Sequence, residues 1–172
     1  MRKKLRSTLM PEKKHISKWA AFAAVAVGVI LAVLSYSGLI PLAYKLGPYW
    51  LNHWIAWSSF GFIIVYAPIF AFLKRRNTRI YGKLMTIHEV GFIVAFMLVS
   101  LHIGPQLRRV FPPEIGTGIA AYVSLFVLVV TGIIQRYQML TARIGTLRTV
   151  HLSMAISFFL VIVFHIIRAF LL

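Results

Sequence analysis

The chain has 172 residues, of which 60% are hydrophobic and 13% are charged. A soluble domain of this size could not bury so much apolar surface, so the composition predicts an integral membrane protein. The chain has no cysteine, which excludes disulfides, thiolate-ligated zinc, cysteine-bound iron–sulfur clusters and covalently attached haem. It also has no aspartate, which excludes the common motifs of phosphoryl transfer.

The net charge is +16, and the basic residues fall almost wholly between the apolar runs. In a soluble protein such a charge would suggest binding to nucleic acid. Between membrane spans it is better interpreted as a determinant of topology and a contact with anionic membrane lipid. We therefore expect no nucleic-acid partner.

Five apolar runs have lengths near the roughly 20 residues that a hydrocarbon core of about 30 Å requires. They predict an all-α polytopic membrane protein with five transmembrane helices, at residues 19–40, 54–73, 84–104, 117–135 and 150–171. Residues 1–18 form a basic tail. The first run is too long for the core of a signal peptide and lacks a convincing cleavage site, so we interpret it as a retained anchor.

The distribution of basic residues predicts the orientation. Fifteen lie in the tail and in the loops that follow the second and fourth runs, whereas four lie on the opposite side. The positive-inside rule then places the N-terminus in the cytoplasm and the C-terminus outside. We expect a multi-pass protein of the cell (inner) membrane.

An internal repeat emerges when the chain is shifted against itself by 63 residues. Residues 84–88 then align with 147–151, and residues 101–103 with 164–166. The second to fifth helices therefore look like two copies of one helical hairpin, at about 54–104 and 117–171. We expect a four-helix bundle over 54–171, with the first helix outside the repeat.

Four of the six histidines form two pairs, His88 with His102 and His151 with His165, and each pair is fourteen residues apart. In a helix, fourteen residues advance by ~21 Å and return to within ~40° of the same face. The repeat makes the third and fifth helices parallel, which brings His88 level with His151 and His102 level with His165. Two facing pairs of imidazoles at two depths are what two bis-histidine haems require, so all four are predicted iron ligands.

Other interpretations of the histidines stay open. A histidine within a membrane span often packs or forms a hydrogen bond between helices. Zinc or copper is disfavoured, because ligands ~21 Å apart on one helix cannot share a metal and two histidines fall short of the usual three or four for zinc. The alternative functions are a small proton-coupled transporter, which should carry acidic residues in its spans, and a structural membrane subunit without haem.

With these histidine pairs, residues 54–171 resemble the transmembrane domain of ferric reductases and NADPH oxidases, and the four-helix haem core of the cytochrome b of respiratory quinol oxidoreductases. The resemblance implies two haem b groups and transmembrane electron transfer. His88 and His151 would ligate the haem on the cytoplasmic side, and His102 and His165 the haem on the outer side.

The chain departs from the reductase family in two respects. It has five predicted spans where that family usually has six, and it leaves no segment for a flavin or nicotinamide domain. We therefore expect a haem-carrying subunit of an oxidoreductase complex. Its redox partners would be a cytoplasmic flavin or iron–sulfur protein, an outer c-type cytochrome, or membrane quinol bound at a quinone site.

Further residues are predicted to surround the haems. Arg148 and Arg168 lie three residues from His151 and His165 respectively, and Arg109 lies seven residues after His102, so all three are candidates to pair with haem propionates. The alternative is that these arginines anchor the helices at the membrane interface. Gly91 lies three residues after His88, where the missing side chain would admit a flat macrocycle, although glycine also serves plain helix packing.

Two other residues have a structural and a functional interpretation. Glu89 is the only acidic residue near a span interior, and we favour an ion pair with Arg79, Lys83 or Arg148 over a proton relay beside a quinone. His53 lies among tyrosines and tryptophans at the start of the second span, where an interfacial aromatic belt is favoured over a quinone pocket.

Overall fold

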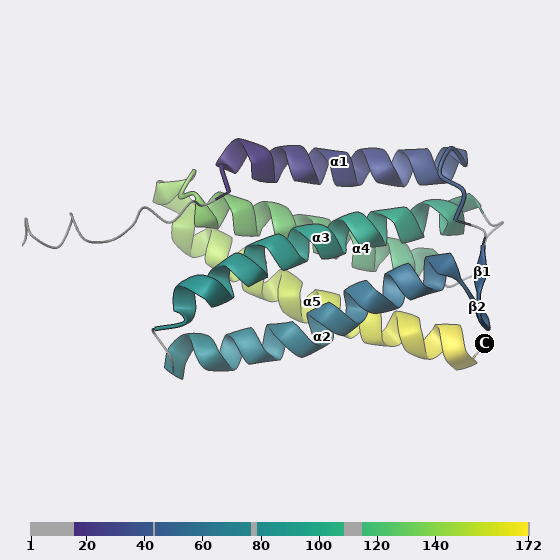
Figure 1. The fold of residues 1–172 in the computed structure, drawn as a ribbon. Helices are drawn as coiled ribbons and strands as arrows, with labels where there is room; N and C mark the ends of the chain where they lie inside the picture. The colour runs from purple at the N-terminus through teal and green to yellow at the C-terminus, as the bar shows by residue number, and fades with distance from the viewer. Residues whose placement is uncertain (1–15, 43, 77–78, 109–114, 172) are drawn as a thin grey trace, which may run out of the picture.

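The computed structural model describes residues 16–42, 44–76, 79–108 and 115–171 (Figure 1). Its long helices are α1 (Lys18–Ser37), α2 (Leu51–Arg76), α3 (Tyr81–Arg108), α4 (Ile115–Arg136) and α5 (Ile144–Leu171). All five are long and apolar enough to cross a membrane. The predicted all-α, multi-pass fold is confirmed.

Most helices extend beyond the predicted apolar runs, because polar residues continue the backbone hydrogen bonding outside the hydrocarbon layer. The first helix instead ends earlier than predicted, at Ser37 rather than residue 40. Gly38 adopts a left-handed conformation with a φ of 82°, and its N–H donates to the carbonyls of Leu34 and Ser35. This C-cap stops the helix although the chain stays apolar. At the other end, the Ser17 side chain accepts a hydrogen bond from the Ala20 N–H.

A short hairpin that the sequence pattern did not predict joins α1 to α2. Strands β1 (Lys45–Leu46) and β2 (Tyr49–Trp50) are antiparallel, with Lys45 opposite Trp50. The indole of Trp54, in the first turn of α2, donates to the Leu46 carbonyl at 2.9 Å. The Tyr49, Trp54 and Trp57 rings pack edge to face with one another. The hairpin is therefore fixed to the start of α2 by an aromatic cluster.

The two histidine-bearing helices have the same length. Helices α3 and α5 each contain 28 residues, and their bounds differ by 63 at both ends. This offset equals the period of the sequence repeat. A short 3₁₀ turn, η1 (Thr141–Arg143), lies directly before α5.

Helix α3 lies at the centre of the molecule, where it packs against α1, α2 and α4 (Figure 1). Helix α5 packs along α4, and within the described residues it has no extended backbone packing with α2 or α3. The first helix packs on α3 and α4. In the part of the chain that the structure describes, the bundle of α2 to α5 thus has three directly packed helix pairs, α2 with α3, α3 with α4 and α4 with α5.

The best-packed part of the interior lies where α1, α3 and α4 meet. The Phe96 side chain of α3 is completely buried, with its ring centroid 5.5 Å from that of Tyr122 and 5.8 Å from that of Phe126. Gly28 of α1 leaves room for the Phe96 ring, since a Cβ there would lie 2.6 Å from Phe96 Cε1. This core anchors the first helix to the repeat-derived bundle.

Candidate functional site

The four paired histidines lie on α3 and α5, and the contacts of α4 fix the relative direction of these helices. Three contacts between α4 and α5 are nested about one point near residue 141: Gln135 with Leu147, Thr131 with His151, and Thr117 with His165. Helix α4 is therefore antiparallel to α5.

Helix α4 is also antiparallel to α3. Tyr137, directly after α4, bonds to Glu89 near the start of α3, whereas Tyr122, nearer the start of α4, lies 3.1 Å from the Ser100 hydroxyl in the second half of α3. Helices α3 and α5 consequently run in the same direction, as the repeat predicts. His88 and His151, near the starts of α3 and α5, therefore lie toward one end of the bundle, and His102 and His165 lie toward the other.

At the first level, the imidazoles of His88 and His151 are close enough to interact electrostatically, and both lie within electrostatic range of Lys74 at the end of α2. The His88 ring stacks on Phe70 of α2, with centroids 4.4 Å apart, and lies 4.6 Å from the ring of Phe92. Its Nδ1 is buried and has no hydrogen-bond partner within the described residues. A buried polar atom of this kind costs free energy.

At the second level, His102 is held by Asn52, at the start of α2. His102 Nδ1 lies 3.0 Å from Asn52 Oδ1 and 3.2 Å from the Asn52 backbone oxygen. A backbone carbonyl can only accept a hydrogen bond, so Nδ1 carries the proton and donates it. The lone pair of the neutral ring then lies on Nε2, which is the protonation state of a histidine that binds a metal through Nε2.

The histidines of α5 are held by threonines of α4. His151 Nδ1 lies 3.0 Å from Thr131 Oγ1, and His165 Nδ1 lies 3.0 Å from Thr117 Oγ1. Our reading of the sequence missed these threonines and Asn52. The threonines left a signal, because Thr117 and Thr131 are fourteen residues apart, like the histidines that they contact. Asn52 left none, since its position depends on how α2 packs against α3.

Each level of the bundle carries two histidines, one from α3 and one from α5. Within the residues that the structure describes, no group of three or more potential ligands from histidine, aspartate and glutamate side chains comes together. A porphyrin supplies four nitrogens itself, so its iron needs only one imidazole on each face. Three of the four histidines have Nδ1 held by a polar partner.

The predicted glycine and arginines around the haems differ in how far they are buried and in what they contact. The space beside Gly91 is taken by the Phe62 ring of α2, since a Cβ there would lie 2.1 Å from Phe62 Cζ. Gly91 thus serves helix packing against Phe62 in this structure, and its role in admitting a macrocycle stays a prediction. Arg148 is exposed near the start of α5, and Arg168 is half-buried near its end. Arg109 lies outside the described residues.

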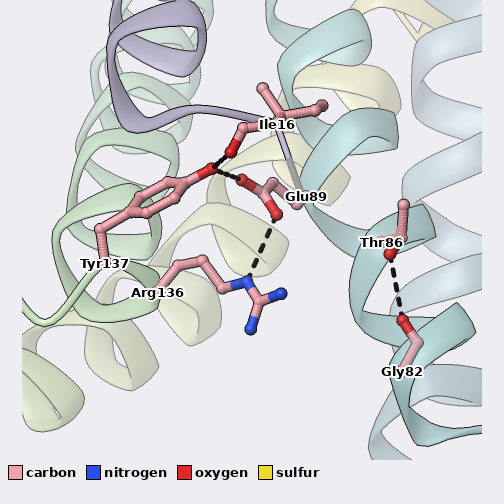
Figure 2. Close-up of polar contacts among 6 residues, drawn as sticks. All are labelled: Ile16, Gly82, Thr86, Glu89, Arg136 and Tyr137. Carbon is pink, nitrogen blue, oxygen red and sulfur yellow. Dashed lines mark hydrogen bonds and ion pairs between the residues drawn. The ribbon is translucent and has the colours of Figure 1, made fainter. Parts of the chain in front are cut away.

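Glu89 forms an ion pair, but with a different partner from the three that the sequence suggested. Its Oε2 lies 3.5 Å from Arg136 Nε, and its Oε1 accepts a hydrogen bond from the Tyr137 hydroxyl at 2.7 Å (Figure 2). The prediction of Arg79, Lys83 or Arg148 was wrong, because these residues lie before or within the histidine helices α3 and α5, whereas Arg136 ends α4. The antiparallel neighbour α4 brings its C-terminal end to this position instead.

The same cluster connects the segment before α1 to the bundle. The Tyr137 hydroxyl lies between Glu89 and the Ile16 backbone carbonyl, to which it also donates (Figure 2). Burial, then the hydrogen bond to Glu89 and the negative charge of its carboxylate, raise the pKa of Tyr137 from 10.0 to about 12, against the opposing charge of Arg136. The phenol therefore stays protonated at neutral pH.

His53 lies at the second level, with its ring centroid 6.4 Å from that of His102. It belongs to the first turn of α2, beside the cluster of Tyr49, Trp54 and Trp57. This position agrees with the expected interfacial belt of aromatic residues.

Comparison with known protein families, with curated proteins and with solved structures found no match for this chain.

Proposed function

We propose that this chain is a dihaem cytochrome b-type subunit that carries electrons across a membrane, as its resemblance to ferric reductase and quinol oxidoreductase membrane domains implies. One observation carries the proposal. Four histidines lie in two pairs at two levels of parallel helices, and three of the four rings are held through Nδ1 by polar side chains. A single hydrogen bond from a histidine to a neighbouring helix is common in membrane proteins. The support for haem is the repetition of the histidines at the same fourteen-residue spacing on two parallel helices, which is what two bis-histidine haems would need.

In this proposal His88 and His151 hold one haem, and His102 and His165 hold the other. The two histidines on each helix are ~21 Å apart along the axis, so the two levels divide the thickness of the membrane between them. A bis-histidine haem supplies a one-electron iron couple without an open coordination position. The protein contributes the fixed imidazoles and an apolar surrounding that excludes water.

The arginines at the ends of the histidine helices would serve the anionic propionates. Arg148 lies at the end of the bundle that carries His88 and His151, and Arg168 lies at the end that carries His102 and His165. A cation beside each level is what a group with two carboxylates needs at the edge of the hydrocarbon layer. Arg109 remains a third candidate.

The proposal also includes an orientation and partners. The first level, beside Glu89 and Lys74, would face the cytoplasm of a cell (inner) membrane, because the basic loops gather at that end. A flavin or iron–sulfur protein, or membrane quinol, would exchange electrons there or within the membrane. An outer c-type cytochrome would do so at the other end.

The test is to purify the chain in mild detergent after expression with haem available, and to measure haem b per chain with reduced-minus-oxidised spectra. We expect about two haems per chain. His102→Ala should lower the content toward one. The matched control is His53→Ala, since His53 lies beside His102 at the same end of the bundle but outside the proposed ligand set.

A folded but colourless protein would contradict the proposal and favour the alternative of a proton-coupled transporter or a structural subunit. An equal loss of haem in His102→Ala and His53→Ala would show that the assignment of ligands is wrong.

A further inference from the structure

We propose that α4 is a positioning helix for the two histidines of α5, through two copies of a Thr–Gly pair. In each copy the threonine, Thr131 or Thr117, fixes the tautomer of one imidazole, and the glycine that follows lets the ring lie against the α4 backbone. The inference rests on the proposed function only for the identity of the group that Nε2 binds.

The tautomer follows from the single hydroxyl proton of Thr131. Its Oγ1 lies 2.7 Å from the Val127 carbonyl oxygen and 3.2 Å from that of Leu128, and both carbonyls can only accept a hydrogen bond. The hydroxyl proton is therefore used within α4. The Thr131 oxygen then offers a lone pair toward His151, and in this proposal the shared proton belongs to the His151 Nδ1, 3.0 Å away. The lone pair of His151 then lies on Nε2.

The glycines beside the threonines set the distance of the rings from α4. A Cβ at Gly132 would lie 3.4 Å from His151 Cε1, and a Cβ at Gly118 would lie 3.2 Å from His165 Cε1. Cε1 is the ring atom between the two nitrogens, so each glycine faces the edge of the imidazole that the neighbouring threonine holds. A side chain larger than methyl would push the ring away from the threonine oxygen.

The two copies match the histidines in spacing and direction. Thr117 and Thr131 are fourteen residues apart, as are His151 and His165, and α4 runs antiparallel to α5. One helix thus supports both levels. The first hairpin lacks this arrangement, since the positions 63 residues before the threonines are Trp54 and Pro68. There, His102 uses Asn52, while the His88 Nδ1 has no partner in the described part of the chain.

The test compares Thr131→Val, Thr131→Ser and the matched Thr117→Val in the full chain. Valine has nearly the shape of threonine without the hydroxyl, and serine keeps the hydroxyl without the methyl. The first readout is the tautomer of haem-free protein with ¹⁵N-labelled histidine, measured by NMR. We expect the Nδ1–H form of His151 to be lost in Thr131→Val and kept in Thr131→Ser, while Thr117→Val changes His165 only.

The second readout is the haem-loaded protein. Thr131→Val should shift the midpoint potential and the low-spin electron paramagnetic resonance signal of one haem, with about 10–100-fold weaker haem affinity, and Thr117→Val should do so for the other. Thr131→Ser should restore the wild-type values. These potentials and signals would not move if the threonines only filled space.

The outcomes separate the two proposals. Haem-free wild-type protein that shows the Nδ1–H tautomers and loses them in the valine variants supports the positioning role even if no haem binds. Unchanged tautomers in the valine variants overturn it even if two haems bind. The valine variants could also lose haem altogether. In that case an equal loss in Thr131→Ser would point to packing and would also overturn the positioning role.

Discussion

The four candidate ligands differ in what holds the Nδ1 atom of each ring. Asn52, Thr131 and Thr117 hold three of them, whereas His88 presents a buried Nδ1 to aromatic neighbours. A hydrogen bond in such a place contributes about 1 kcal/mol, and an unpaired buried polar atom costs about 1–3 kcal/mol. Three of the four rings thus gain a polar contact, whereas the buried Nδ1 of His88 is unfavourable for the stability of the folded chain.

This difference predicts opposite effects of two substitutions on haem-free protein. His88→Phe removes the unpaired Nδ1 from a site lined by Phe70 and Phe92, so the free energy of unfolding should rise or stay unchanged. His151→Phe breaks the bond to Thr131 and should lower that free energy by about 1–3 kcal/mol. Unfolding by denaturing detergent, followed by circular dichroism, measures both. Equal destabilisation would refute the distinction.

Tyr137 is expected to titrate late. Its pKa is raised in the folded chain to about 12, so the stabilisation from the protonated phenol is fully present below pH 10 and is lost as the pH rises through 12. The absorbance change of tyrosinate in wild type minus Tyr137→Phe should have its midpoint near 12. A midpoint near 10 would mean that the phenol is not buried beside Glu89.

Among the elements, α1 and α3 pack closely at Gly104. A Cβ at Gly104 would lie 2.0 Å from Ser35 Oγ, 2.6 Å from the Tyr36 nitrogen and 2.8 Å from the Ala32 oxygen. Two of these three atoms are backbone, so a rotamer change cannot make room. Ser35 is itself buried and donates to the Ala32 carbonyl at 3.1 Å. Small residues that allow such an approach are typical of packed membrane helices.

Gly104→Ala should therefore push α1 away from α3 and lower the free energy of unfolding by about 1–3 kcal/mol. The matched control is Gly61→Ala in α2, where a Cβ would meet nothing within 4 Å. There alanine should be neutral or stabilising, because it favours the helix by roughly 1 kcal/mol over glycine. Detergent unfolding of the two variants checks the difference, and equal losses would argue against the close α1–α3 contact.

At the scale of the whole molecule, the five helices present two ends of different charge. Lys45, in the hairpin before α2, is exposed at one end, and Lys83, in the first turn of α3, is exposed at the other. The excess of basic residues at the second end predicts that it faces the cytoplasm.

The absence of cysteine makes this orientation testable with single-cysteine variants that carry no background. Lys45→Cys should react with a membrane-impermeant maleimide on intact cells, and Lys83→Cys should react only after the membrane is permeabilised. Each variant serves as the control for the other, and the reverse pattern would invert the proposed topology.

Some features of the fold and of the candidate site could be predicted from the sequence, and others could not. The five spans and the parallel direction of α3 and α5 could be predicted, because both follow from local hydrophobicity and from a repeat of period 63. The end of α1 could not be placed from apolar content, because the left-handed Gly38 terminates it. The partner of Glu89 was missed because Arg136 is 47 residues away and meets it only through packing of α4 on α3.

Sequence alone is enough to predict the spans, the all-α class and the fourteen-residue spacing of each histidine pair, because the length and pitch of a membrane helix follow from backbone geometry. The three-dimensional packing was needed to show that α1 packs on α3, that Thr131 and Thr117 hold the α5 histidines, and that Asn52 holds His102. These helices are apolar on nearly all sides, so periodicity does not reveal which face meets a neighbour. That choice depends on small residues and on hydrogen bonds between helices.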